Sequence, residues 1–375
     1  MQTTDFMNIL NELGAGFFTG VPDSLLSAFT DEIVSKYGIG EKHVVAANEG
    51  AAVGLAAGHY LATGNPAVVY MQNSGIGNAI NPICSLLHEK VYAIPVIFVI
   101  GWRGEPGTKD EPQHIFQGLT TLEMLELVEI PYIVISNDYK KSAEIEGFKQ
   151  HIQNGRSVAF VIKKDALVNE NKKKYENNLP LSREESLKII LNTSTTDDVF
   201  VCTTGKLSRE VYELRQNSGI AGRDFLTVGS MGHSLMIAFG IALAKNTHRV
   251  FCLDGDGAML MHMGSVAVVG VHSPKNLVHV VINNGAHETV GGLTTVSKHI
   301  KLMDIAKAVG YKNCFFVKTE DELSKILNEY KTDKFIDGPI FIEIACNLFS
   351  RKDLGRPISS PIENKKTFMK GFLCH

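Results

Sequence analysis

The sequence predicts an α/β protein with two similar domains, each a mainly parallel sheet flanked by helices. Three observations support this fold class. Short runs rich in β-branched residues alternate with longer segments of helical period along the whole chain, which is typical of βαβ units. Each half contains six strand candidates, and a polar, charged stretch lies between the halves. With 375 residues, the chain is long enough for two domains of this kind.

The strands are expected in twelve short apolar runs, with helical patterns in most of the gaps. In the first half the runs are Phe17–Gly20, His43–Ala47, Ala67–Gln72, Val96–Gly101, Tyr132–Ser136 and Val158–Lys163. In the second half they are Val199–Thr204, Phe225–Gly229, Arg249–Leu253, Leu277–Asn283, Asn313–Lys318 and Ile340–Ala345. The equal numbers indicate that the two halves share one architecture.

The domain boundaries are predicted from composition. Residues 166–182 are polar and charged with little to bury, which is typical of a linker between domains. We therefore expect a first domain at residues 1–165 and a second at residues 183–350. Only a linker separates the two, so no central third domain is expected.

The last segment, residues 351–375, is expected to form a tail without helix. It contains Gly355, Pro357 and Pro361, and proline cannot continue a helix that has already begun. We expect this tail to wrap around a surface or a partner.

Charge and hydropathy exclude two classes of partner. The chain has 37 basic and 40 acidic residues and no long basic run, so nucleic acid is not expected as a partner. Its longest apolar stretches, such as Ala93–Trp102, are about ten residues long, whereas a membrane span needs roughly twenty. The N-terminus lacks the pattern of a signal peptide, so we expect a cytoplasmic protein. The six cysteines show no zinc-site spacing and are expected to be reduced thiols.

Oxygen ligands follow two strands of the second half. Gly255-Asp256-Gly257 ends one strand, and Asn283-Asn284 ends the next after 25 intervening residues, enough for one helix and the return strand. The carboxyl ends of parallel strands meet at one edge of a sheet, and glycines there let backbone N–H groups approach an anion. Carboxylate, carboxamide and carbonyl oxygens suit Mg²⁺ carrying a diphosphate. The alternative is a tight turn capped by Asp256 and an Asn-Gly turn at 284–285.

This spacing resembles the cofactor and metal motif of the decarboxylases that depend on thiamine diphosphate (ThDP). The resemblance implies ThDP and Mg²⁺ as cofactors. It also implies that Asp256, the side chain of Asn284 and the carbonyl group of Ala286 are the metal ligands.

The same family needs a glutamate opposite the aminopyrimidine ring of ThDP, and Glu49 matches it. Glu49 follows a predicted strand and begins a helix among small apolar residues, where poor solvation should raise its pKa. By resemblance, Glu49 shares a proton with the ring nitrogen N1′ and so activates the cofactor. The alternative is that Glu49 only favours the first turn of its helix.

Further segments resemble the cofactor-binding loops of this family. Residues 72–78 resemble a loop that approaches the cofactor, and residues 229–233 resemble the segment whose bulky apolar side chain, here Met231, supports the bent cofactor. The expected cofactor-binding residues are Glu49, Ser74, Asn78, Gly205, Met231, Gly232, Gly255, Asp256, Gly257, Ala258 and Asn284. A core methionine that fills a gap is the alternative for Met231.

The two-domain layout resembles the phosphonopyruvate and sulfopyruvate decarboxylase branch of the family. The resemblance lies in residues 20–24, 103–114, 283–292 and 353–357 and extends over nearly the whole chain. It implies decarboxylation of 3-phosphonopyruvate to phosphonoacetaldehyde and CO₂ in phosphonate biosynthesis of the 2-aminoethylphosphonate type. Sulfopyruvate is the close alternative, and ordinary pyruvate is a weaker one.

A 2-oxo acid with a second anionic group needs additional hydrogen-bond donors. Candidates lie in two loops that follow strands, where substrate-selective residues usually occur. The expected substrate-binding residues are Arg103, Lys109, His114, His287 and Lys298. By resemblance, Asp23 and His287 join Glu49 as catalytic residues, with Asp23 contributing to proton transfer. Each basic residue taken alone can also be an ordinary solvated charge.

Two readings from other classes remain open. A nucleotide-binding α/β protein without decarboxylase activity would bind a dinucleotide, but Gly75-Ile76-Gly77 lacks the third glycine of that fingerprint. A structural or interaction protein ranks last, because it has little reason to place Glu49, Asp256 and Asn284 at strand ends. The family resemblance implies a homodimer or larger homo-oligomer with ThDP at the subunit interface.

Overall fold

The computed structural model describes residues 1–139, 143–169, 173–220, 222–332 and 337–373. It divides the chain into two compact units, residues 1–174 and 175–375. Residues 170–172 of the expected linker and residues 374–375 of the expected tail, including Cys374, lie outside the described residues. The other five cysteines are free thiols.

The first unit is a parallel sheet of six strands with the order β2-β1-β3-β4-β6-β5. Its strands are β1 (Phe18–Gly20), β2 (His43–Val45), β3 (Ala67–Gln72), β4 (Val96–Gly101), β5 (Tyr132–Ile135) and β6 (Val158–Ile162). Its α-helices are α1 (Thr3–Glu12), α2 (Ser27–Tyr37), α3 (Glu49–Thr63), α4 (Ile76–Pro82), α5 (Pro112–Leu127) and α6 (Glu144–Gln153). Short helical turns lie at η1 (Ser24–Leu26), η2 (Asn73–Gly75) and η3 (Ile83–Leu87).

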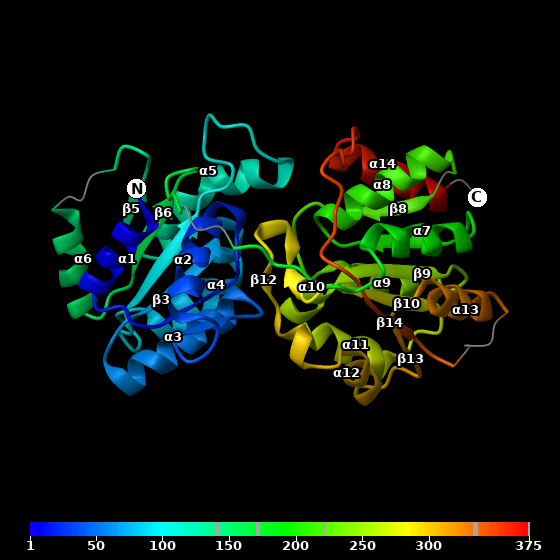
Figure 1. Cartoon of the computed structure of the whole chain (residues 1–375), viewed down its shortest axis with the longest axis horizontal. Helices are drawn as coiled ribbons and strands as arrows, with labels where there is room; N and C mark the ends of the chain where they lie inside the picture. The colour runs from blue at the N-terminus through cyan, green and yellow to red at the C-terminus, as the bar shows by residue number, and fades with distance from the viewer. Residues whose placement is uncertain (140–142, 170–172, 221, 333–336, 374–375) are drawn as a thin grey trace. The chain divides into compact units, whose positions relative to one another are not determined.

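Helices cover both faces of this sheet (Figure 1), and alternate residues of its strands face two separate cores. On one face, Val68 and Tyr70 of β3 pack with side chains of α1, α2 and α6. On the other face, Val69 and Met71 pack with side chains of α3, α4 and α5. Strands buried on both faces are nearly continuous apolar runs, which explains why they could be predicted from the sequence.

The second unit repeats this design. Its main sheet has the order β13-β14-β10-β9-β7-β8 and consists of β7 (Val199–Cys202), β8 (Arg223–Leu226), β9 (Val250–Gly255), β10 (Leu277–Asn283), β13 (Asn313–Val317) and β14 (Ile340–Ala345). Every strand pair in it is parallel. If the strands of each main sheet are numbered from one to six along the chain, both sheets have the order 2-1-3-4-6-5, starting from β2 in the first unit and from β8 in the second. The predicted fold class is therefore confirmed.

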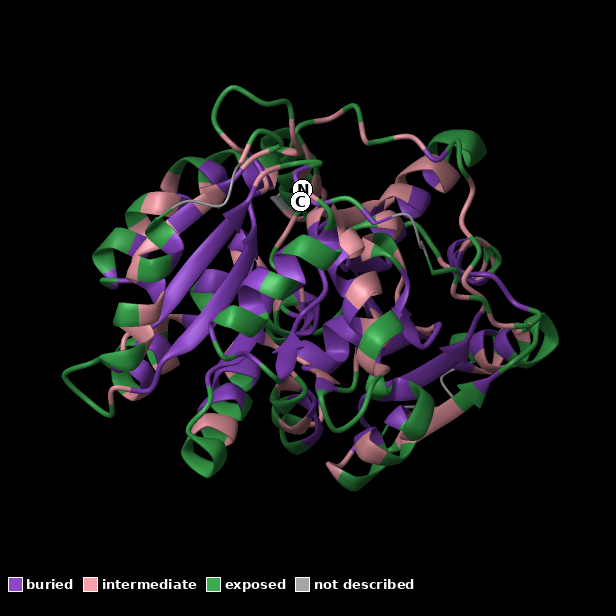
Figure 2. Ribbon diagram, turned by 60° about the vertical axis from the view of Figure 1, so that its left-hand side comes forward, coloured by how far each residue is buried: buried purple, intermediate pink, exposed green. Residues whose placement is uncertain are grey.

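Helices cover both faces of this sheet as well, and its four inner strands β7, β9, β10 and β14 are almost entirely buried, whereas the edge strands β8 and β13 are partly exposed (Figures 1 and 2). The helices are α7 (Arg183–Thr193), α8 (Lys206–Ser218), α9 (Ser234–Ala244), α10 (Asp256–Met261), α11 (Gly264–His272), α12 (Leu302–Ala308), α13 (Glu320–Lys331) and α14 (Pro361–Leu373). Side chains of α7, α8 and α13 share one core with the sheet. Helices α9 and α12 contact strands of the same sheet.

The segment after β10 is more regular than the loop predicted there. Strands β11 (Ala286–His287) and β12 (Leu293–Thr294) pair as an antiparallel hairpin. Two 3₁₀ turns, η4 (Glu288–Val290) and η5 (Val296–His299), complete the segment. The hairpin holds this part of the chain over the end of β10.

The prediction of a tail without helix is wrong, because residues 361–373 form α14. Pro361 occupies the first helical position, where its fixed φ angle and missing N–H group cost nothing. Ser360 and Glu363 form a reciprocal capping box: the Glu363 N–H group donates to Ser360 Oγ, and the Ser360 N–H group donates to Glu363 Oε2. The proline therefore begins a helix instead of preventing one.

Helix α14 covers the edge of the second sheet. Strand β8 is an edge strand, and Asn364 of α14 binds its exposed backbone. The Leu226 N–H group donates to Asn364 Oδ1 at 3.1 Å, and Asn364 Nδ2 donates to the Asp224 carbonyl oxygen at 3.0 Å. Phe368 packs against Phe225 with ring centroids 5.5 Å apart.

Within the described residues, no helix is both long and apolar enough to cross a membrane.

We predict that Asn364→Ala loosens this edge without unfolding the protein. Two hydrogen bonds to β8 are lost, at about 0.5–1.5 kcal/mol each, so the local opening free energy should fall by about 1–3 kcal/mol. Hydrogen exchange at the Leu226 amide measures this opening. Lys365→Ala, an exposed neighbour on the same helix, is the control. Unchanged exchange at Leu226 in Asn364→Ala would contradict the prediction.

Candidate active site

In the first unit, polar side chains gather where β1, β3 and β4 end. Asp23 follows β1, residues 72–78 follow β3, and Arg103 follows β4. These strands are neighbours in one parallel sheet, so their carboxyl ends lie along the same edge. Glu49 begins α3, which follows β2 and packs against α4.

Glu49 is a buried carboxyl group that a neutral donor holds in place. Its side chain is 5% exposed, and Asn78 Nδ2 donates to its Oε2 at 2.8 Å. Gly75 leaves the room for it, because a Cβ atom at Gly75 would lie 2.5 Å from Glu49 Oε1. Burial raises the pKa of Glu49 more than the hydrogen bond from Asn78 lowers it. The sequence-based expectation of a poorly solvated Glu49 agrees with this geometry.

Asp23 is the second buried carboxyl group of this edge. It has no exposed surface, and Gln72 Nε2 donates to its Oδ1 at 2.6 Å. Ser74 Oγ donates in turn to Gln72 Oε1 at 2.7 Å, so Ser74 and Asp23 are linked through one glutamine. Burial raises the pKa of Asp23, against smaller opposing effects of Gln72 and of the Arg103 charge.

Arg103 is held by a carboxylate of its own loop. Its Nε donates to Asp110 Oδ2 at 2.8 Å, its Nη2 donates to Asp110 Oδ1, and its Nη1 donates to Ser24 Oγ at 2.9 Å. Although burial opposes the effect, Arg103 and backbone donors hold the pKa of Asp110 far below its usual range. Arg103 therefore lies close to Asp23, as a basic group near that acid, but most of its charge is already compensated.

The other basic candidates of this loop differ in their surroundings. His114 is buried at the start of α5, and burial together with the Arg103 charge lowers its pKa to about 4, so its ring is neutral at pH 7. Its Nδ1 atom has no hydrogen-bond partner among the described residues. Lys109 lies exposed on the loop. The structure thus brings His114 near Arg103 and leaves Lys109 in solvent.

In the second unit, Asp256 lies at the end of β9, where it begins α10. It is 3% exposed, and its Oδ2 accepts hydrogen bonds from Thr295 Oγ1 at 2.5 Å and Ser297 Oγ at 2.8 Å. Burial raises the pKa of Asp256 to about 6, although both hydroxyl groups lower it. The two hydroxyl groups hold this carboxyl group in one orientation, and within the described part of the chain it forms no ion pair with a basic side chain.

Asn284 lies at the end of the neighbouring strand β10, as the motif predicts. Its Oδ1 accepts the Ala286 N–H group at 3.0 Å, and its Nδ2 donates to Glu288 Oε2 at 3.2 Å. The preceding Asn283 accepts from Ser297 Oγ at 2.9 Å, so Ser297 bonds both strand ends. The structure therefore brings together the two predicted side-chain ligands, with Ala286 in the same turn.

A glycine-lined region lies beside Asp256. A Cβ atom at Gly257 would lie 3.1 Å from His287 Cε1 and 3.3 Å from Met231 Cε, so the three residues converge. The N–H group of Gly229 donates to Thr204 Oγ1, which ties the loop of Met231 and Gly232 to the end of β7.

The two basic candidates of the second unit differ in their surroundings. Desolvation of the His287 ring lowers the pKa of His287 to about 4. Lys298 is exposed, and its aliphatic stem covers Gly285.

These residues fit a diphosphate carried by a divalent metal ion. Asp256 and Asn284 supply hard oxygen atoms, which is the donor type that Mg²⁺ prefers. At the end of β7, the buried Thr203 Oγ1 has no hydrogen-bond partner among the described residues, and Gly205 follows with a φ angle of 98°. A backbone of this kind at the start of α8 can approach an anion closely.

The sequence reasoning missed three residues of this region: Glu288, Thr295 and Ser297. All three lie in the segment that follows the Asn-Asn pair, and Thr295 and Ser297 contact Asp256 across about forty positions of sequence. Their hydroxyl and carboxyl groups were the only signal, and such groups are common in surface turns. Only the hairpin β11–β12 brings them to the strand ends.

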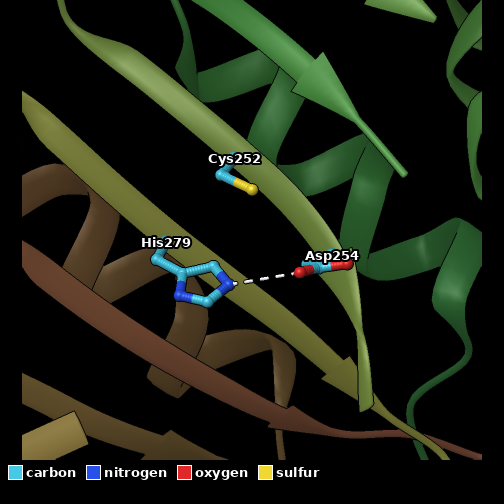
Figure 3. Close-up of side chains that lie close together, drawn as sticks. All are labelled: Cys252, Asp254 and His279. Atoms are coloured by element: carbon cyan, nitrogen blue, oxygen red, sulfur yellow. Dashed lines mark ion pairs between the residues drawn. The ribbon is translucent and has the colours of Figure 1, made fainter. Parts of the chain in front are cut away.

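A separate polar group lies inside the second sheet (Figure 3). Cys252 and Asp254 point from β9 and His279 from β10, and all three are buried. His279 Nε2 lies 3.5 Å from Asp254 Oδ2. Burial raises the pKa of the Cys252 thiol well above its usual value, which keeps it protonated and a poor metal ligand. We therefore assign this group to the packing of the sheet.

Comparisons with known proteins match both units. Residues 3–124 match the family model of the thiamine pyrophosphate enzyme N-terminal TPP binding domain, and residues 204–344 match that of the C-terminal TPP binding domain. The predicted resemblance to enzymes that depend on thiamine diphosphate, which is the same compound, is confirmed.

Similar proteins extend along nearly the whole chain. The phosphonopyruvate decarboxylase of Streptomyces viridochromogenes is 33% identical over 97% of this chain and 93% of its own. That of Streptomyces hygroscopicus is 30% identical over 98% and 93%. A sulfopyruvate decarboxylase of Methanosarcina acetivorans is 26% identical over 74% and 76%. The chain therefore belongs to the phosphonopyruvate decarboxylase family of thiamine pyrophosphate enzymes.

Proposed function

We propose that this protein decarboxylates 3-phosphonopyruvate to phosphonoacetaldehyde and CO₂, with thiamine diphosphate and Mg²⁺ as cofactors. One observation carries the proposal: a buried glutamate and a pair of oxygen ligands stand at strand ends of a chain that matches phosphonopyruvate decarboxylases along nearly its whole length. The protein is a thiamine-diphosphate-dependent decarboxylase of 2-oxo acids.

The bound cofactor supplies a place for the electron pair that remains when the bond to CO₂ breaks. In our proposal Glu49 holds a proton between its carboxyl group and the ring nitrogen of the cofactor. Its raised pKa supports this role, because a carboxyl group shares a proton well only when the charged form is disfavoured. At this end of the site, Asn78 donates a hydrogen bond to Glu49, and Ser74 donates one to Gln72.

At the other end, we propose Asp256, Asn284 and the carbonyl group of Ala286 as the ligands of Mg²⁺. Backbone N–H groups near Gly205, Gly232, Gly255, Gly257 and Ala258 would bind the diphosphate, and Met231 would support the cofactor. The support is the burial and fixed orientation of Asp256 and the convergence of Met231 and His287 on Gly257.

Asp23 is proposed to deliver the proton that replaces CO₂ on the product. Complete burial raises its pKa, which favours the protonated form more than in an exposed aspartate. His287 has a pKa of about 4 and is therefore neutral, so it would accept or donate a hydrogen bond without carrying charge. The catalytic roles of Asp23 and His287 are part of this proposal.

The second anionic group of the substrate is proposed to bind among Arg103, Lys109, His114, His287 and Lys298. Arg103 is the candidate that the geometry supports best, because its charge acts on Asp23 and one of its nitrogens bonds Ser24 beside that acid. The compensation of Arg103 by Asp110 favours a site that binds a dianion only with help from further donors.

Sulfopyruvate is the second candidate substrate, and the relative from Methanosarcina acetivorans supports it. We further propose a homodimer or larger homo-oligomer in which each cofactor lies between the N-terminal domain of one subunit and the C-terminal domain of another. The support is that Glu49 and Asp256 belong to different compact units. A cytoplasmic location stays a prediction.

Kinetics on three acids test the substrate. We expect CO₂ release from phosphonopyruvate to exceed that from sulfopyruvate and pyruvate in kcat/KM by at least about tenfold, because one charge-assisted hydrogen bond is worth about 1.5–3 kcal/mol. Release without thiamine diphosphate and Mg²⁺ is the blank for each acid. A higher kcat/KM for sulfopyruvate would assign the protein to the second candidate.

Glu49→Gln tests the proton-sharing role. The amide keeps the size of the side chain but cannot share a proton, so turnover should fall by about 10²–10⁴-fold while the fold is retained. The exchange rate of the acidic cofactor proton, measured by NMR on the bound cofactor, should fall with it. Glu41→Gln, an exposed residue of the same unit, is the control. Normal exchange in Glu49→Gln would disprove the role.

Asp256→Asn tests the metal site. The variant removes a charged oxygen ligand, so calorimetric titration should give ThDP affinity in Mg²⁺ at least about tenfold weaker, and the dependence of that affinity on Mg²⁺ should shrink. Asp304→Asn, on the surface of α12, serves for comparison. Wild-type affinity in Asp256→Asn would remove this residue from the proposed site.

A further inference from the structure

Glu288 stands in the middle of a buried polar network in the second unit. Its side chain is 9% exposed and accepts hydrogen bonds from three residues. Arg183 Nη1 lies 2.5 Å from Oε2, Asn284 Nδ2 lies 3.2 Å from the same atom, and Lys206 Nζ lies 2.9 Å from Oε1. The carboxylate therefore connects the start of α7, the start of α8 and the end of β10.

The charges of this network balance. Arg183 also bonds Glu210 with two nitrogens at 2.6 and 2.7 Å, and Lys206 also donates to Ser350 Oγ at 2.6 Å. Two positive and two negative side chains thus compensate one another, and three of them are at most 9% exposed, whereas Lys206 is 27% exposed. Each carboxyl oxygen of Glu288 accepts a hydrogen bond from a cationic side chain, Oε2 from Arg183 and Oε1 from Lys206, and neither cation can accept one in return. In this network Glu288 therefore acts only as an acceptor.

This has a direct effect on Asn284. A carboxamide has one oxygen and one NH₂ group, and it can turn over to exchange them. Because Glu288 only accepts, Asn284 must direct its NH₂ group to Glu288. The Ala286 N–H group, which only donates, fixes the opposite end, since it bonds Oδ1 at 3.0 Å. Asn284 is thus locked in the orientation that presents oxygen, with one lone pair still available.

We propose that Glu288 is a positioning residue for the divalent metal ion. Glu288 locks the carboxamide of Asn284 with the Oδ1 atom toward the metal, and its other carboxyl oxygen holds Lys206 in an ion pair. The inference rests on the metal site under Proposed function. Groups that orient a metal ligand from behind are commonly worth about 10–100-fold in metal affinity, although they never touch the metal.

Glu288→Gln tests the proposal in the full chain with thiamine diphosphate and Mn²⁺ as the probe. Glutamine keeps the shape but can donate as well as accept, so Asn284 loses an acceptor-only partner, and only the Ala286 N–H group still orients its carboxamide. It also leaves Arg183 and Lys206 with one excess positive charge, which repels a cation. The Mn²⁺ dissociation constant, measured from the EPR signal of free Mn²⁺, should rise by about 10–100-fold.

Glu210→Gln is the matched control. Glu210 is more deeply buried, at 1% exposed against 9% for Glu288, and it bonds the same arginine, but among the described residues its hydrogen bonds reach neither Asn284 nor Lys206. It should change the Mn²⁺ dissociation constant by less than about threefold. Equal losses in both variants would mean a general structural effect, and wild-type affinity in Glu288→Gln would also overturn the proposal.

Two further measurements keep the outcomes distinct. If Glu288→Gln does not fold, Glu288→Asp keeps the charge but is one methylene too short to reach all three partners, and it should lose Mn²⁺ affinity with the fold retained. If the wild-type protein itself binds no Mn²⁺ with thiamine diphosphate, the proposed metal site is wrong, and the role of Glu288 is refuted with it. Normal wild-type binding with unchanged variants refutes only the role of Glu288.

Discussion

The burial of every central strand on both faces is the constraint on which the rest of this molecule depends. Few polar side chains lie along such strands, with Asp254 and His279 among the exceptions, and most collect where the strands end. In a parallel sheet those ends share one edge, and both sheets have the same strand order. The same folding pattern therefore produces one polar edge with Asp23 and Glu49, and another with Asp256 and Asn284. The chemistry of the family is distributed over two copies of one architecture.

Three buried carboxyl groups share a common mode of support. Asn78 holds Glu49, Gln72 holds Asp23, and two hydroxyl groups hold Asp256. Uncharged donors fix the direction of a carboxyl group without stabilising its charge enough to offset burial, so its pKa stays raised. Asp110 shows the contrast: Arg103 bonds it twice, and its pKa falls. Neutral support thus leaves the charge of these three carboxyl groups without a bonded cation, in contrast to Asp110.

The sequence was sufficient for features that depend on local pattern. Buried strands are apolar runs, and the Gly-Asp-Gly and Asn-Asn motifs lie at their ends, so the fold class and the placement of Glu49, Asp256 and Asn284 after strands could be predicted without coordinates. Residues that act through contacts with residues far away in the sequence could not be predicted in this way. The bonds of Glu288 to Arg183 span 105 positions, and nothing near Arg103 indicated that Asp110 would bind it. Helix α14 was missed because proline was read as an end instead of a first residue.

The position of α14 also bears on how the edge of the second sheet is protected from pairing with the strand of another molecule. An uncovered edge strand offers a row of backbone donors and acceptors to any other extended chain, and it is a common starting point for aggregation. Asn364 occupies two of these groups on β8 with its own side chain. A truncated form that ends before residue 361 would present the backbone groups of β8 to neighbouring molecules. Helix α14 therefore protects this edge strand from aggregation in addition to being a part of the domain.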